Sequence, residues 1–176
     1  MRYELKNNRN GEKIDEFLTT VDVVKTDKEL SFEFFCKNSK FYSASNEYNG
    51  LIYNGDVCEA FISTGNDITV YYEIEVAPNG TIFLYKMKNL GVGMFDATPI
   101  PEEDCFVTAE VEKLNDTDYR VKFSMPLEKI GYDEKIGITF NAFRIETEGG
   151  IIDKNILALS PTLCETFHCV DSFIKL

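Results

Sequence analysis

Hydrophobic side chains recur at every second position in many short segments of the chain, which is the period of a β-strand. These segments are rich in Val, Ile, Phe and Tyr and are bounded by turn residues, a combination typical of strands. They predict strands at residues 30–36, 58–63, 70–76, 81–86, 105–113, 119–124 and 135–145, with a short last strand at 173–176. Helical periodicity is poor, and only residues 126–130 predict a single helical turn, because proline is tolerated at its start.

Two short turns predict how neighbouring strands are connected. Residues 77–80 read Ala-Pro-Asn-Gly, in which proline presets one dihedral angle and Asn-Gly accepts positive φ; residues 115–118 connect the next pair in the same way. No internal repeat or linker divides the 176 residues. The pattern predicts an all-β fold, an antiparallel β-sandwich of the jelly-roll or immunoglobulin-like two-sheet type, as one domain over residues 1–176.

Composition narrows the range of partners. The formal net charge is -12, so the chain repels phosphate backbones and anionic membrane surfaces, and we expect neither nucleic acid nor membrane as a partner. A neutral ligand, a cation or a basic protein stays open, and the simplest role of the charge is solubility. Aromatic residues make up 13% of the chain, with 14 Phe, 9 Tyr and no Trp, which favours strands further. The oligomeric state is left open.

The cysteines favour a reducing environment. Their number is odd, and without a CxxC pair they indicate neither a zinc site nor a disulfide framework. They are Cys36, Cys58, Cys105, Cys164 and Cys169. The first ten residues lack the apolar stretch of a signal peptide, and no apolar run reaches membrane-spanning length. If the chain is complete, a cytoplasmic location is expected.

The chain offers few residues for catalysis. Its one histidine, His168, is adjacent to Cys169, but strand neighbours point to opposite faces, which argues against a cysteine–histidine dyad. A partly buried, hydrogen-bonded histidine is the simpler interpretation. Asp116 with Asp118, and Asn66 with Asp67, could offer oxygen ligands to calcium, but turns explain each pair more simply.

Glu59 is the most informative carboxylate. It shares one strand face with Phe61, and the other face of the same strand is also apolar, so the segment is expected to be buried on both sides. A buried carboxylate needs partners. Arg144, within another apolar strand, is one candidate for an ion pair, and the alternative is that Glu59 forms the polar floor of a small-molecule site.

Two groups of motifs follow one another along the chain. The first comprises residues 51–62 (LIYNGDVCEAFI) and 71–81 (YYEIEVAPNGT); the second comprises residues 140–145 (FNAFRI), 159–161 (LSP) and 167–168 (FH), ahead of Phe173. Their order and spacing resemble the family 9 carbohydrate-binding modules and their DOMON-like relatives, over roughly residues 30–176.

The resemblance implies a β-sandwich with a slot between two aromatic side chains, which grips a saccharide end while polar groups bind its hydroxyls. It implies non-catalytic carbohydrate binding without an organic cofactor, and it allows for a structural calcium ion without assigning ligands. The implied ligand-binding residues are Tyr53 and Phe167 as aromatic walls, and Asp56, Glu59, Asn141, Arg144 and His168 as their polar neighbours.

The chain also departs from the family pattern. The stacking residues of the family are typically Trp, and this chain has none, with Leu159 in place of the Trp before Ser-Pro. Three alternatives therefore stay open. They are an orphan or protein-interaction sandwich that lost its sugar slot, a glycosidase or esterase using Glu59, and a haem-binding relative using His168 and Met94.

Overall fold

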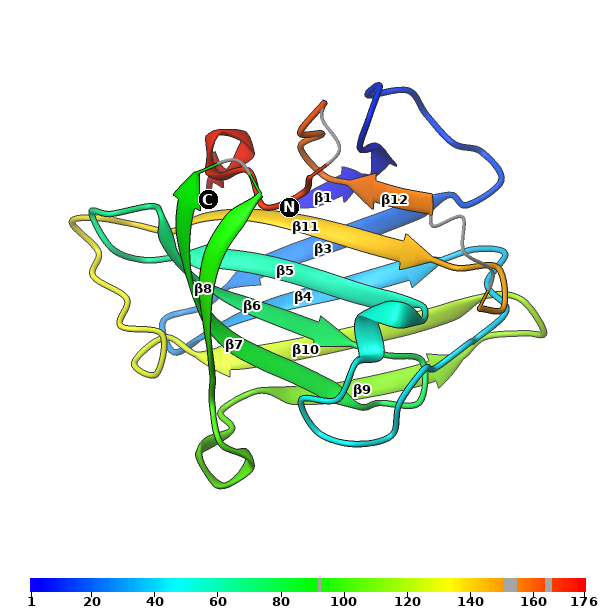
Figure 1. The fold of residues 1–176 in the computed structure, drawn as a ribbon, viewed down its shortest axis with the longest axis horizontal. Coiled ribbons are helices and arrows are strands. Elements are labelled where there is room, and N and C mark those ends of the chain that lie inside the picture. Colours follow the sequence, from blue (N-terminus) through cyan, green and yellow to red (C-terminus); the bar gives the residue numbers. More distant parts are fainter. Residues whose placement is uncertain (92, 151–154, 164–165) are drawn as a thin grey trace.

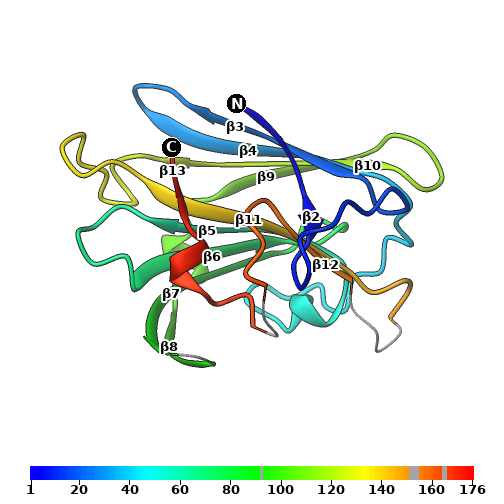
Figure 2. The same ribbon diagram turned by 90° about the horizontal axis from the view of Figure 1, so that it is seen from above.

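The computed structural model describes residues 1–91, 93–150, 155–163 and 166–176; Cys164 lies outside the described residues. Two antiparallel sheets stack on one another, as the sequence predicted (Figures 1 and 2). The smaller sheet has the order β1-β3-β4-β10-β9. Its strands are β1 (Arg2–Glu4), β3 (Thr19–Lys25), β4 (Glu29–Cys36), β10 (Tyr119–Pro126) and β9 (Thr108–Lys113).

The larger, eight-stranded sheet carries the features of functional interest. Its order is β2-β12-β11-β5-β6-β7-β8, with β13 paired to β11. The strands are β2 (Lys6–Asn7), β12 (Asn155–Ala158), β11 (Thr139–Glu146), β5 (Val57–Ser63), β6 (Val70–Val76), β7 (Ile82–Gly91), β8 (Met94–Pro99) and β13 (Ile174–Lys175). Three short 3-10 turns accompany them: η1 (Ile52–Asn54), η2 (Glu102–Asp104) and η3 (Val170–Ser172).

Both predicted hairpins are confirmed. Gly80 adopts φ +85 in the turn between β6 and β7, where Ala77 N–H donates to the Thr81 carbonyl over 3.0 Å. Residues 115–118 join β9 to β10. The helical turn predicted at residues 126–130 is wrong: proline ends β10, and hydrogen-bonded turns follow instead.

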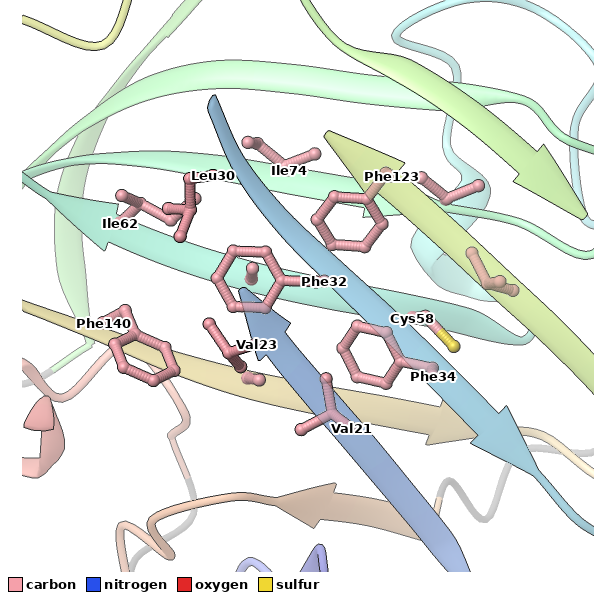
Figure 3. Packing of buried hydrophobic residues seen from close by; sticks show 14 of the residues in the cluster. Val21, Val23, Leu30, Phe32, Phe34, Cys58, Ile62, Ile74, Phe123 and Phe140 are labelled. Carbon is pink, nitrogen blue, oxygen red and sulfur yellow. The ribbon is translucent and has the colours of Figure 1, made fainter. Parts of the chain in front are cut away.

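The core lies between the two sheets. Its central aromatic side chains, Phe32 and Phe123, stack with ring centroids 5.4 Å apart, and Phe140 meets Phe32 edge-on at 5.7 Å (Figure 3). Val21 and Val23 of β3 pack beside them and are fully or almost fully buried. Each fully buried side chain of this size contributes about 1.5–3 kcal/mol, so this layer holds the sandwich together.

The outer face of the larger sheet is also largely covered. All seven residues of β5 are buried, which confirms the prediction of burial on both faces. On this face, η1 lies at one side and β8 curls away from the smaller sheet (Figure 2). Phe173 and Phe167 of the C-terminal segment pack on Phe61 of β5. In the described part of the chain, no helix is long and apolar enough to cross a membrane.

Candidate functional site

Strand register places three glutamates together on the outer face of the larger sheet. Glu75 of β6 lies directly opposite Glu59 of β5, and Glu73 lies opposite Phe61, one row further along. One carboxylate oxygen from each of the three lies within 4.8 Å of the other two, and all three side chains are buried. Like charges facing each other across a sheet are destabilising, so this patch lowers stability unless a proton or cation joins it.

A pocket of about 460 Å³ opens above this patch. Its floor comes from β6 and β7, and its rim from η1, β8 and the C-terminal segment. The lining residues are Asn49, Leu51, Tyr53, Asn54, Glu73, Glu75, Phe83, Tyr85, Met87, Phe95, Ala97, Ile145, Ile156, Phe167 and His168. Mostly apolar walls with a few polar groups are typical of small-molecule sites.

One aromatic wall belongs to η1 and β7. Phe83 and Tyr85 stack with centroids 4.1 Å apart, and Tyr53 meets Phe83 edge-on at 5.7 Å. Tyr53 projects from η1, whose neighbouring Ile52 is fully buried and anchors the turn. Burial and the nearby Glu75 carboxylate raise the pKa of Tyr53, so its hydroxyl stays protonated at neutral pH.

The other wall is a stack centred on His168. Its ring lies 4.4 Å from Phe95, 4.8 Å from Phe167 and 4.9 Å from Phe61, measured between centroids. The Nδ1 atom is 2.8 Å from the Tyr71 hydroxyl, which confirms the predicted hydrogen-bonded histidine. Rings stacked closely around this imidazole argue against the haem alternative.

His168 and Glu73 do not form an ion pair at neutral pH, although Nε2 and Oε1 lie 3.8 Å apart. Burial lowers the pKa of His168 to about 4, so its ring is neutral. Burial also raises the pKa of Glu73 to about 7, and hydrogen bonds with Glu59 and Glu75 oppose that rise. With a pKa of about 7, the Glu73 carboxyl is partly protonated at neutral pH, which reduces the negative charge of the glutamate patch.

The glutamate patch alone does not make a calcium site. One oxygen from each glutamate is close enough to the others for all three to bind one metal ion. Calcium takes six to eight oxygen ligands, so it would need further ligands in addition to these three. The structural calcium ion therefore stays a prediction.

The structure brings together four of the residues singled out in the sequence. Tyr53, Phe167 and His168 line the pocket, and Glu59 lies beside its two floor carboxylates. The pairing of Glu59 with Arg144 is wrong. Glu59 lies opposite Phe143, and Arg144 lies opposite Cys58, so the two side chains point to opposite faces of the sheet.

Arg144 lies inside the sandwich. Its guanidinium donates to Glu146 Oε2 over 2.6 Å, to Thr19 Oγ1 over 2.9 Å and to the Lys37 carbonyl over 2.9 Å. Both charged side chains are fully buried. The arginine therefore ties β11 to the smaller sheet and does not line the pocket.

Asp56 also has a structural environment. It is fully buried, and its carboxylate accepts hydrogen bonds from Ser39 Oγ, from Tyr42 N–H, and from both the N–H and hydroxyl of Thr147. It ties the segment before η1, which carries Tyr53, to the residue that follows β11. Like Arg144, it does not line the pocket.

Asn141 organises the C-terminal segment. Its amide nitrogen donates to the Ser160 carbonyl over 2.7 Å and to Ser172 Oγ over 3.0 Å, and its oxygen accepts from Ser160 N–H over 3.0 Å. These bonds hold both ends of the segment that contains Phe167. Asn141 does not itself line the pocket, so its contribution to a site is positional.

Five residues that line the pocket were not expected from the sequence: Glu73, Glu75, Phe83, Tyr85 and Phe95. A usable signal was present in β6, where Tyr71, Glu73 and Glu75 alternate on one face. The alternating glutamates are typical of a solvent-facing strand. In the structure, the C-terminal segment, which is distant in sequence, covers this face.

Comparisons with known proteins agree with this fold. No protein-family model matches the chain. A Bacteroides uniformis protein, described as a candidate carbohydrate-binding protein, superposes with a TM-score of 0.77 at 14% identity, covering 98% of this chain and 84% of that one. A family 9 carbohydrate-binding module from Caldicellulosiruptor kristjanssonii in complex with glucose gives 0.65 at 13% identity, covering 98% and 82%. The chain therefore has the fold seen in family 9 modules.

A second module structure from Caldicellulosiruptor kristjanssonii, in complex with cellotriose, gives a TM-score of 0.56 at 13% identity, covering 89% of this chain and 71% of that one. In sequence, the chain is 34% identical over 84 residues to a protein of Arthroderma benhamiae named "Extracellular protein". That match spans 46% of this chain and 38% of the relative. The cytoplasmic location expected for this chain stays a prediction.

Proposed function

We propose that this protein binds carbohydrate without chemically changing it, holding a saccharide end in the pocket between the Tyr53 wall and the Phe167 wall. The observation that carries the proposal is the pocket itself, in which both aromatic residues implied by the sequence line one cavity above buried carboxylates. The fold shared with solved modules, two of which hold glucose or cellotriose, supports it.

The polar set differs from the one implied by the sequence. Glu73 and Glu75 face the pocket and accept hydrogen bonds from saccharide hydroxyls, with Glu59 beside them. Arg144, Asp56 and Asn141 act indirectly, by holding the elements that carry the walls. Tyr and Phe faces replace the usual Trp, which gives less stacking area and a weaker grip.

Calorimetry with glucose and cellotriose tests the proposal, using the wild type and Tyr53→Ala. Losing one stacking ring should weaken binding by about 1–2 kcal/mol, which is roughly 5–30-fold. Tyr132→Ala is the matched control, because Tyr132 is half-buried in the connection between β10 and β11, outside the pocket lining. Equal affinities for wild type and Tyr53→Ala would place any binding elsewhere, and absence of binding would favour the orphan alternative.

Glycoside hydrolysis is the second candidate, because two pocket carboxylates lie close together and the pKa of Glu73, about 7, suits a general acid. Carboxyl groups that flank a glycosidic bond lie about 5–5.5 Å or 6.5–9.5 Å apart. Here the oxygens lie within 4.8 Å, side by side on one floor. Release of reducing sugar from cellotriose, abolished in Glu73→Gln, would favour the enzyme.

A further inference from the structure

The charge of the pocket is strongly one-sided. Among the described lining residues, Glu73 and Glu75 are the acidic groups, and no lysine or arginine accompanies them. Glu73 is 5% exposed and Glu75 is 1% exposed, and the fully buried Glu59 carboxylate lies within 4.8 Å of both. His168 is neutral, so it supplies no positive charge.

The aromatic walls reinforce this preference. The faces of Tyr and Phe rings carry negative electrostatic potential, and cations bind favourably over them. Tyr53, Phe83 and Tyr85 surround one side of the pocket, and Phe95 and Phe167 the other. The net charge of -12 adds a long-range field that attracts cations and repels anions.

A neutral sugar can stack on the aromatic walls, but it brings no positive charge to the carboxylates. A hydroxyl group offers one hydrogen and no charge, whereas an ammonium group offers three hydrogens and a positive charge. An ammonium placed at the floor can offset the repulsion between the facing Glu59 and Glu75.

We infer that the pocket prefers an amine-bearing, positively charged saccharide, with its ammonium group received by the carboxylates of Glu73 and Glu75. This inference rests on the proposed saccharide-binding function and names its ligand class. The aromatic walls hold the sugar ring, and the floor selects the charge.

The test compares three β-1,4-linked trisaccharides that differ at carbon 2: the glucosamine trimer, its N-acetylated form and cellotriose. Calorimetry at pH 7 should show the glucosamine trimer binding about 10-fold or more tightly than the two neutral forms, which is the value of a charge-assisted hydrogen bond. Glu75→Gln and Glu73→Gln should each reduce that preference to about threefold or less, because each removes about one charge-assisted hydrogen bond. Glu110→Gln, which removes an exposed carboxylate on β9, is the matched control and should keep the preference.

The outcomes separate the inference from the proposed function. Cellotriose binding as tightly as the glucosamine trimer would overturn the inference and leave saccharide binding standing. A preference unchanged by both floor substitutions would also overturn it. Cellotriose binding that requires calcium and is lost with a chelator would assign the carboxylates to a metal ion instead. No binding of any trimer would overturn the proposed function and the inference together.

Discussion

The buried arginine gives the sharpest prediction about the fold. Arg144→Met replaces the arginine with an unbranched apolar side chain. It leaves Glu146, whose side chain is fully buried, without its cation. The carbonyl of Lys37 and the hydroxyl of Thr19 lose their donor as well. Removing one partner of a buried ion pair costs about 3–5 kcal/mol, a large part of the roughly 5–15 kcal/mol that stabilises a domain.

Urea unfolding followed by far-UV circular dichroism measures this loss, and it suits a chain without tryptophan. Arg120→Met is the control, because the partly exposed Arg120 bonds Glu33 over 3.0 Å at the surface and its loss should cost about 1 kcal/mol or less. Adding Glu146→Leu to Arg144→Met should recover much of the stability, since an apolar pair replaces a buried ionic one. An Arg144→Met protein as stable as Arg120→Met, yet unable to bind saccharide, would refute the structural role and return Arg144 to the binding site.

Three further predictions concern buried groups. Asp56→Ala removes the acceptor of four hydrogen bonds and should lower the free energy of unfolding by about 3 kcal/mol in urea titrations. An unchanged free energy of unfolding would contradict a structural role for this carboxylate. Phe123→Ala opens a cavity in the core and should cost about 3–5 kcal/mol in the same assay; a cost below 1 kcal/mol would mean that the core collapses around it. Glu73 and His168 should make the free energy of unfolding depend on pH in opposite directions. Folded Glu73 keeps a proton that the unfolded chain releases, so stability falls as pH rises from about 4.5 to about 7, by roughly 3 kcal/mol. The unfolded chain protonates His168 first, so stability is lost as pH falls from about 6.5 to about 4. Thermal melts across this range should show that Glu73→Gln removes the first slope and His168→Gln the second; parallel curves for all three proteins would contradict these pKa shifts.

Local patterns predicted most of the strands. The apolar character of both faces of β5 was enough to predict that Glu59 would be buried. The resemblance placed Tyr53 and Phe167 at the same site, and both line the pocket. Glu59 could be recognised from the sequence because the short-range pattern around it agrees with its three-dimensional environment.

Other features depend on contacts between distant segments. β3 was missed because Thr and Asp interrupt its apolar residues, although Val21 and Val23 belong to the buried core. The role of Glu75 depends on the register between β5 and β6, which places it opposite Glu59. The partner of Arg144 was closer than expected: Glu146, two residues along the same strand, shares its face.

The measurement that tests the central claim most directly is a nuclear magnetic resonance titration of the isotope-labelled protein with cellotriose and the glucosamine trimer. The account predicts that the largest shift changes fall on pocket residues from both walls, among them Tyr53, Tyr85 and Phe167, and that they saturate together. Changes confined to the smaller sheet, or spectra unchanged at millimolar saccharide, would contradict a saccharide site in this pocket.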